Sequence, residues 1–402
     1  MATLLSKLKA VSHEATFPVL MALCAVHCFN DLLQSVVSAV YPMLKDDLHL
    51  TFGQIGIVTL VYQIAASVFQ PVVGYTFDRR PYVGSLPLGM VFTAAGIILF
   101  AYSMSLTTVL IAVFLVGIGS STLHPEASRI TSLASHGRRG FAQSIFQVGG
   151  NLGTSVGPLL VAFIVAPNGR RYIAWFLIVS ALAFLAMRTI CRWYRSYLAS
   201  SSSGDAKTAT HIPRPLTPGR TIFAISVITV LIFSKYIYMA SLTNYYTFYL
   251  IDRFGISIKT SQILLFVFLA ATAIGTLVGG PFGDRYGRKP VIWASILGAA
   301  PFSLVMPHCG LVLTVVMSFC AGFMLASAFP AILLYSQELL PNKLGLVSGL
   351  FFGFAFGVAG VAAAILGHFA DTCGIDAVYN ACAYMPLLGL VTAFLPDLKH
   401  RG

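Results

Sequence analysis

The sequence predicts an all-α polytopic membrane protein, with twelve transmembrane helices arranged as two pseudo-symmetric six-helix halves. Three observations lead to this fold class. The chain of 402 residues is 57% hydrophobic and only 9% charged, whereas soluble proteins are roughly 45–50% apolar and about 25% charged. Apolar runs of roughly 18 residues or more, long enough to cross a bilayer, recur along the chain. A polar segment near the middle separates six of these runs from the other six.

The apolar runs give the expected helices in chain order. They cover residues 16–42, 54–76, 83–103, 106–132, 140–166, 171–191, 220–249, 260–282, 289–307, 310–336, 344–368 and 376–396. Residues 1–15 contain no cleavage site of the signal-peptide kind, so we expect them to stay attached. Most lysines and arginines fall on one side of the spans, which predicts that both termini are cytoplasmic. The net charge of +12 therefore belongs to membrane loops, and we expect no nucleic acid as a partner.

The polar segment at residues 197–220 reads YLASSSSGDAKTATHIPRPLTPGR, first serine-rich and then proline-rich. It has almost nothing to bury, which is typical of a flexible linker. The predicted organisation is an N-terminal half at residues 1–192, a cytoplasmic linker at 193–219 and a C-terminal half at 220–402.

The two halves repeat the same landmarks. Asp78 after the second span corresponds to Asp284 after the eighth, and Pro125 in the fourth span corresponds to Pro330 in the tenth, at almost the same offset. An almost constant offset indicates that the halves are internal structural repeats.

The loop after the eighth span carries the most specific motif. Residues 280–289 read GPFGDRYGRK, which resembles the loop motif of the major facilitator superfamily, and residues 74–81 read GYTFDRRP, a degenerate copy. The resemblance in architecture covers the whole chain. It implies that these loops hold the halves together and gate transport without binding substrate. The residues with this implied gating role are Asp78, Arg79, Gly280, Asp284, Arg285 and Arg288.

Two further segments resemble a particular branch of this superfamily. His27 with Asn30 and Asp31 in the first span, and LHPEASR at residues 123–129 in the fourth, are similar to the fosmidomycin-resistance branch of bacterial drug exporters. That resemblance implies proton-driven efflux of a small phosphonate antibiotic across the inner membrane.

The first span contains a carboxylate near its middle. Asp31 shares a helix face with His27 and Gln34. Ionisable side chains inside a span are costly, and by default they indicate function. We interpret Asp31 and His27 as proton-coupling residues and Gln34 as a substrate-binding residue. The alternative is a polar patch or a hydrogen bond between helices.

The fourth span carries Glu126 and Arg129, which lie three residues apart and can pair directly. One interpretation is a proton-coupling Glu126 held by an Arg129 that also senses an anionic substrate, with His124 beside them as a further substrate-binding residue. The other is a self-neutralised pair near the helix end. Pro125 frees a backbone carbonyl, which membrane proteins tolerate where it lines a cavity.

The seventh span adds Lys235, so two acids and two bases balance within the spans that line the central cavity in this superfamily. Tyr238, Asn244 and Tyr245 follow Lys235 and are candidate substrate-binding residues, although most tyrosines here are expected to pack or to lie at the interface. Glu338 lies at a span end, as does Asp371, and both are expected to be solvated or to cap helices.

The fifth span has glycines at a spacing of four, which predicts close helix packing. The packing residues are Gly149, Gly153, Gly157 and Pro158. Their pattern also resembles the antiporter motif of exporters, with its trailing glycines replaced. Cys24 and Cys28 lie four residues apart, but we expect packing there and no metal.

Together these observations predict a proton-coupled antiporter that exports a small anionic antibiotic. It is expected to work as a monomer in the lipid bilayer, with protons and a small-molecule substrate as partners and no cofactor beyond the proton gradient. An uptake symporter for an organic acid or sugar phosphate has the same machinery and stays open. A membrane-embedded enzyme or sensor is the third alternative, but the sequence carries no HExxH or GxSxG motif.

Overall fold

The computed structural model describes residues 2–135, 139–201, 216–340 and 344–398. The helices are α1 (Ala2–Ala39), α2 (Tyr41–Leu48), α3 (Phe52–Arg79), α4 (Ser85–Ala101), α5 (Leu106–Ala134), α6 (Arg139–Leu160), α7 (Ala166–Asn168), α8 (Leu177–Ser201), α9 (Pro218–Phe254), α10 (Ile258–Tyr286), α11 (Arg288–Gly298), α12 (Ala300–Val305), α13 (Leu311–Leu339), α14 (Leu344–Cys373) and α15 (Ile375–Cys382). Short segments of tighter or wider helix continue several of them: η1 (Val161–Val165), η2 (Arg170–Phe176), η3 (Met306–His308) and η5 (Met385–Phe394).

The spans predicted from the sequence are present as helices. Among the described residues, 11 helical stretches are long and apolar enough to cross a membrane, and the shorter apolar helix α4 provides the remaining span. The prediction of twelve transmembrane helices is confirmed. The main difference is at α8, which continues to Ser201, so the start of the range predicted as linker is helical. No proline or glycine interrupts residues 193–201, and the helix therefore has no local reason to stop earlier. The central part of that predicted linker, 202–215, lies outside the described residues.

Local sequence explains where several helices begin and end. Thr51 caps α3, because its hydroxyl accepts a hydrogen bond from the Gln54 amide while the Gln54 side chain accepts one from the Thr51 amide. Ser105 and Thr108 form the same reciprocal cap on α5. At the other end of a span, Gly255 closes α9 with φ +62°, a left-handed conformation that glycine adopts without steric cost.

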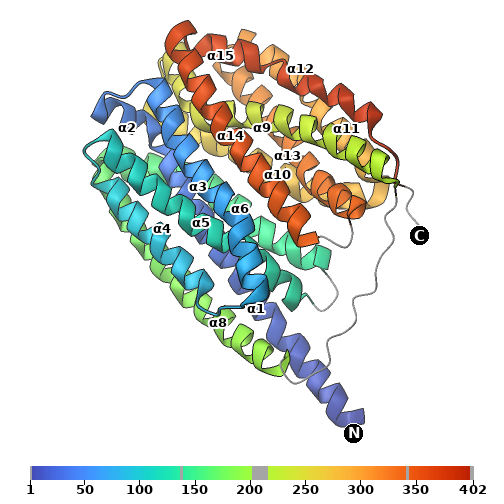
Figure 1. The fold of residues 1–402 in the computed structure, drawn as a ribbon. Coiled ribbons are helices and arrows are strands. Elements are labelled where there is room, and N and C mark those ends of the chain that lie inside the picture. The colour runs from blue at the N-terminus through green and yellow to red at the C-terminus, as the bar shows by residue number, and fades with distance from the viewer. Residues whose placement is uncertain (1, 136–138, 202–215, 341–343, 399–402) are drawn as a thin grey trace.

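The helices form two groups, one from α1 to α8 and one from α9 to η5 (Figure 1). In the first group α1 packs on α6, and α5 packs on α3 and α4; in the second, α13 packs on α10 and α11. Between the groups α3 lies against α14 and α6 lies against α10. The groups are close together at the end where α3 begins and diverge toward the end where α1 begins (Figure 1). We call these the joined end and the terminal end.

Glycines allow α1 and α6 to approach closely. A Cβ atom on Gly149 would lie 2.1 Å from the carbonyl oxygen of Cys24, and one on Gly153 would lie 2.0 Å from that of Cys28. No side chain fits at such distances, so the small-residue spacing that predicted close packing has α1 as its partner.

Pro158 adds a polar contact to the same helix pair. Proline has no backbone N–H, so the carbonyl of Thr154 one turn earlier is left without its helical donor. The hydroxyl of Ser35 on α1 donates to that carbonyl at 2.6 Å. Gly157 gives Ser35 the necessary room, since a Cβ there would meet its Oγ at 2.6 Å.

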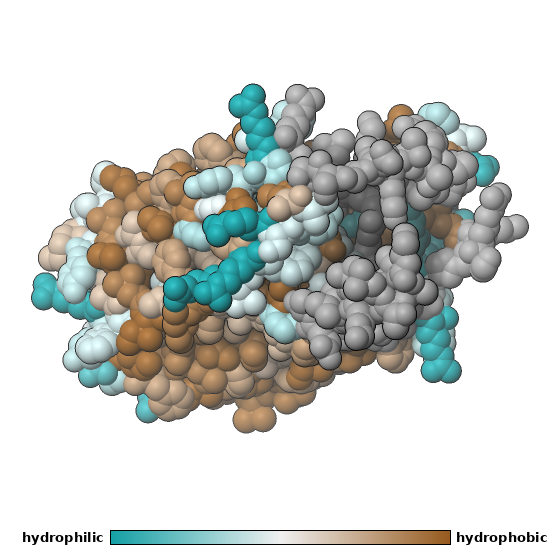
Figure 2. Space-filling model, turned by 90° about the horizontal axis from the view of Figure 1, so that it is seen from below, coloured by the Kyte–Doolittle hydropathy of each residue, from teal (hydrophilic) through white to brown (hydrophobic). Residues whose placement is uncertain are grey.

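The outer surface of the bundle matches a lipid environment. Large apolar side chains such as Val72, Phe163, Ile222 and Ile365 are exposed on the sides of the helices. Figure 2 looks from below toward the terminal end and shows hydrophobic residues along the flanks, with polar residues gathered on the face in view. The chain is thus a multi-pass membrane protein.

Candidate functional site

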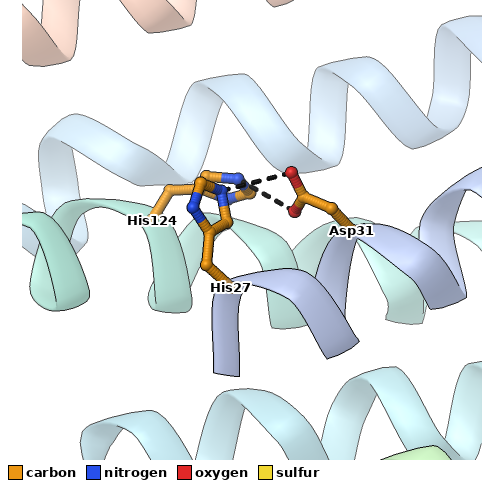
Figure 3. Close-up of side chains that lie close together, drawn as sticks. All are labelled: His27, Asp31 and His124. Carbon is orange, nitrogen blue, oxygen red and sulfur yellow. Dashed lines mark ion pairs between the residues drawn. The ribbon is translucent and has the colours of Figure 1, made fainter. Parts of the chain in front are cut away.

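Three titratable side chains meet inside the first group of helices. His27 and Asp31 lie one turn apart on α1, and His124 lies on α5. Nε2 of His27 is 3.2 Å from Oδ2 of Asp31, and Nε2 of His124 is 3.4 Å from Oδ1. Both imidazole rings point at the carboxylate (Figure 3). We call these residues the His–Asp–His triad. Asp31 keeps 16% of its surface exposed and His124 keeps 13%, so the triad is partly accessible although it lies in the middle of two spans.

Backbone contacts determine which nitrogen of each histidine faces Asp31. Nδ1 of His27 lies 2.8 Å from the carbonyl oxygen of Phe146, and Nδ1 of His124 lies 3.0 Å from that of Ser120. A carbonyl oxygen can only accept a hydrogen bond, so each Nδ1 carries a hydrogen. Each Nε2 therefore presents a lone pair to the carboxylate when the ring is neutral and an N–H when the ring is protonated. The triad is held together electrostatically only when protons occupy it.

The same atoms have room for a metal ion in place of protons. Among the residues that the structure describes, the potential ligand atoms of the triad all lie within 4.8 Å of one another, a spacing that could hold a metal ion. Two imidazoles and a carboxylate are common ligands of transition metals. No metal was expected from the sequence, and we interpret the triad as a proton site.

Helix α6 supports the triad from behind. The His27 ring stacks on the Phe146 ring with centroids 4.0 Å apart. A Cβ atom on Gly150 would lie 2.4 Å from Cε1 of His27 and 2.7 Å from Oδ2 of Asp31. The backbone of α6 thus touches two members of the triad, and only glycine fits at this position.

Amide side chains extend the polar group along α1. Asn30 donates from Nδ2 to Oδ1 of Asp31 at 3.0 Å. The hydroxyl of Tyr62 on α3 donates to Oε1 of Gln34, while Nε2 of Gln34 has no hydrogen-bond partner among the described residues. A buried donor without a partner is costly, which makes Gln34 available to a ligand.

Glu126 and Arg129 form a pair of their own on α5. Nε and an Nη of Arg129 donate to the two carboxylate oxygens of Glu126 at 3.0 and 2.9 Å, and Arg129 also donates to the hydroxyl of Tyr194 on α8. Glu126 is 1% exposed. Within the described part of the chain, no ion pair connects these residues to the triad. This bidentate geometry favours the alternative of a self-neutralised pair that ties α5 to α8.

Lys235 is a buried charged group in the second group of helices. It lies within α9 and is only 4% exposed. Its Nζ sits 5.4 Å from the ring centroid of Tyr236 and 5.0 Å from that of Phe329 on α13. Among the described residues no carboxylate pairs with Lys235. Aromatic faces stabilise a cation partly, but they leave its charge without an anion.

A row of phenylalanines connects Lys235 to the triad. The Phe329 ring lies 5.4 Å from Phe352 on α14, which lies 6.2 Å from Phe356. The Phe356 ring in turn lies 6.1 Å from that of His124 on α5. The two charged centres therefore belong to different groups of helices and are separated by side chains that have no charge of their own.

The other candidates on α9 are engaged in contacts between helices. The side-chain amide of Asn244 accepts from Thr59 of α3 at 3.0 Å and donates to the Ala240 carbonyl at 2.9 Å. The hydroxyl of Tyr245 donates to the carbonyl of Ala363 on α14 at 2.6 Å. In this conformation their polar groups already have hydrogen-bond partners, and their role in substrate binding stays a prediction. Tyr238 is buried and its hydroxyl has no hydrogen-bond partner among the described residues.

Comparison with known proteins identifies the family. A model of the Major Facilitator Superfamily matches residues 23–364 and 237–401. The chain belongs to the major facilitator superfamily. It is 52% identical to the fosmidomycin resistance protein of Escherichia coli (strain K12), over 96% of this chain and 95% of that protein. It is 39% identical to the uncharacterized MFS-type transporter YfnC of Bacillus subtilis (strain 168), over 98% and 97% of the two chains. The chain is thus a transporter of the fosmidomycin-resistance branch of this superfamily.

Solved structures share the fold. A bacterial homolog of the human lysosomal transporter Spinster, in an inward-facing and occupied conformation, matches with a TM-score of 0.70 over 94% of both chains. The superfamily transporter FucP, in its outward conformation, matches with a TM-score of 0.66 over 95% of this chain and all of that one. Both are 15% identical in sequence, so they show the architecture of the superfamily alone.

The loop residues that resemble the superfamily motif are described in part. The side chains of Asp78, Arg79 and Asp284, and Gly280 beyond its place in α10, lie outside the described residues. Arg285 is exposed, with its guanidinium 5.4 Å from the Tyr286 ring centroid. Arg288 lies 3.4 Å from a carboxylate oxygen of Glu338, a contact within the second group. Their gating role stays a prediction.

Sequence reasoning missed several residues of the site. Phe146, Gly150 and Tyr62 contact the triad or Gln34 from α6 and α3, and Phe356 reaches His124 from α14. Gly150 had a usable signal, because it adjoins the glycine spacing of its span. The phenylalanines had none, since phenylalanine in an apolar span is ordinary.

Proposed function

We propose that this transporter exports small phosphonate anions of the fosmidomycin type in exchange for protons. Protons bind the His–Asp–His triad, and the anion binds near Lys235. The observation that carries the proposal is the placement of these two centres on opposite groups of helices, joined by the row of phenylalanines. Groups that rock about a central site can then expose both centres to one side of the membrane at a time.

The triad supports the proton side of this exchange. Each Nδ1 donates to a backbone carbonyl, so only Nε2 faces Asp31. A protonated Nε2 attracts the carboxylate, and the lone pair of a neutral Nε2 repels it. A change in proton occupancy therefore changes the contact between α1 and α5. Asp31 is the coupling carboxylate in this proposal, and Glu126 holds α5 to α8 through Arg129 and Tyr194.

Lys235 supports the anionic substrate. A buried ammonium group whose described neighbours are aromatic rings attracts a phosphonate far more strongly than water-exposed lysine does, because the local dielectric is low. Within the described part of the chain, Nε2 of Gln34 and the hydroxyl of Tyr238 have no hydrogen-bond partner, so both can add hydrogen bonds to the anion. The name of the Escherichia coli relative, a fosmidomycin resistance protein, supports the same substrate class.

The proposal includes an orientation. The protein lies in the bacterial inner membrane, and its terminal end faces the cytoplasm, in agreement with the placement of most basic residues on that side. The protein works as a monomer and needs no cofactor, because the proton gradient supplies the energy. It catalyses no chemical reaction on its substrate.

The test is accumulation of radiolabelled fosmidomycin by inside-out membrane vesicles, with and without an acid interior. We expect gradient-dependent accumulation with the wild type, and none with Asp31→Asn, which cannot bind and release the coupling proton. Exchange of labelled for unlabelled substrate without a gradient should persist in that variant. Asp47→Asn is the matched control, because Asp47 pairs with Arg170 away from the triad.

Three results would contradict the proposal. Accumulation by the wild type without a gradient would exclude proton coupling. Accumulation only in right-side-out vesicles would indicate uptake. Normal gradient-driven export by Asp31→Asn would remove the triad from coupling.

A further inference from the structure

The N-terminus of α3 needs partners for four backbone N–H groups, as every helix does. Its own sequence supplies two of them. The Thr51 amide donates to the Gln54 side chain at 2.9 Å, and the Gln54 amide donates to the Thr51 hydroxyl at 3.1 Å. The amides of Phe52 and Gly53 lie between these two and have no partner within α3.

Asp371 of α14, in the other group of helices, supplies both missing acceptors. The Phe52 amide donates to Oδ1 of Asp371 at 2.7 Å, and the Gly53 amide donates to Oδ2 at 2.7 Å. A Cβ atom on Gly53 would lie 2.9 Å from Oδ2, so glycine is what allows the carboxylate to approach. A negative charge at this position also interacts favourably with the positive end of the helix dipole.

The contact lies at the joined end, where α3 and α14 are in close contact. A Cβ atom on Gly367 would lie 2.4 Å from the Phe52 carbonyl oxygen, and one on Gly56 would lie 2.5 Å from that of Ala363. The backbones of α3 and α14 are therefore in close contact within the first two turns of α14 before Asp371. Any movement that opens the joined end must first separate Asp371 from α3.

We propose that Asp371 is a latch that closes the joined end by capping α3 across the two halves. The cap on α3 is complete only while the halves touch there. Opening leaves the Phe52 and Gly53 amides and the carboxylate to water, so the latch favours the closed state without preventing the opposite one. This role depends on neither the loop motif nor a bound substrate, so it can be tested independently of the proposed function.

The experiment measures the distance across the joined end by double electron–electron resonance. Spin labels are placed at two exposed positions, Asn168 beside η2 and Asp252 near the end of α9, in full-length protein whose seven native cysteines have been replaced. Asp371→Asn keeps the shape of the side chain and removes its charge and one acceptor. We expect the ratio of long to short distances to rise about tenfold, as loss of one charge-assisted hydrogen bond implies.

Asp376→Asn is the matched control. Asp376 is also an exposed carboxylate at the joined end, but its partner Arg253, at 3.1 Å, belongs to the same group of helices. Its substitution should leave the distances unchanged. Gly53→Ala is a second variant that displaces Asp371 without altering it, and it should shift the ratio in the same direction as Asp371→Asn.

Two results would overturn the latch. One is an unchanged distance distribution in both Asp371→Asn and Gly53→Ala. The other is an equal shift in Asp376→Asn, which would show that loss of any carboxylate at this end opens it.

Discussion

Asp31, Glu126 and Lys235 are ionisable side chains within the spans, Asp31 partly accessible and the other two buried, and the structure gives each a different kind of partner. Asp31 faces two imidazoles, Glu126 forms a bidentate pair with Arg129, and Lys235 lies beside two aromatic rings. A buried ion is tolerated when opposite charge or hydrogen bonds surround it. By this criterion Glu126 is satisfied, Asp31 depends on protons, and Lys235 still lacks an anion among the described residues.

Lys235 should therefore determine substrate affinity. We expect Lys235→Met to weaken fosmidomycin binding by about tenfold to a hundredfold, the range for loss of a buried charge-assisted contact. Lys235→Arg keeps the charge and should lose less. Radioligand binding to purified protein measures the effect without a gradient. Unchanged affinity in Lys235→Met would place the anion elsewhere.

Glu126 should matter for stability more than for coupling. Glu126→Gln leaves Arg129 without its bidentate partner, which should cost about 1–3 kcal/mol of stability. A lower unfolding temperature in detergent is expected, with gradient-driven export retained by the folded fraction. Asp376→Asn, which breaks an exposed pair, should lower that temperature less. A stable variant that has lost gradient dependence would instead make Glu126 a coupling residue.

At the scale of elements, α6 is the helix that shapes the triad although it contributes none of its members. Its glycines bring its backbone against α1, and Phe146 both accepts a hydrogen bond from His27 and stacks on it. The histidine orientation therefore depends on how closely α6 packs. A small displacement of α6 therefore changes the orientation of the His27 ring and the distance from its Nε2 to Asp31.

Gly150→Ala tests this dependence. The added methyl group would lie 2.4 Å from the His27 ring, so either α6 or the ring must move. We expect gradient-driven transport to fall at least tenfold while substrate binding at Lys235 changes little. Gly219→Ala on α9 is the control, because a Cβ there meets nothing within 4 Å. Equal transport by both variants would show that the triad tolerates displacement of α6.

At the scale of the whole molecule, the two groups of helices are connected near the joined end. Among the described residues, all hydrogen bonds between the two groups lie toward that end. Besides the Asp371 contacts, Thr59 donates to Asn244, and Gln262 of α10 donates to the Ala39 carbonyl at 2.7 Å. The groups diverge toward the terminal end (Figure 1). The structure is thus a state closed at the joined end. Opening that end requires these few contacts between the two groups to break.

Gln262 gives an independent test of this closure. It is fully buried, and Gln262→Leu removes its donor while keeping a similar volume. The fraction of molecules open at the joined end should increase, measured with the same pair of spin labels. Because Gln262 and Asp371 act on different helix pairs, the double variant should open more than either single one. No change in Gln262→Leu would mean that this bond contributes nothing to closure.

The sequence by itself determined the twelve spans, their order and the superfamily, because each follows from local properties: the length of an apolar run, the position of a charge, and a ten-residue loop motif. It also selected His27, Asp31 and His124 as candidates, since polar side chains are conspicuous in an apolar chain. Glycine spacing likewise predicted close packing in the fifth span, although it could not name α1 as the partner.

Only the tertiary structure decided how these side chains combine. It placed His124 with Asp31, added Tyr194 to the Glu126–Arg129 pair that the sequence spacing had predicted, and left Lys235 beside two aromatic rings. It also brought Asp371 to the start of α3, a contact across more than three hundred residues of sequence. Such contacts depend on which helix faces pack together, and each span is apolar on nearly all sides, so no periodic pattern in the sequence marks the face that will meet a given neighbour.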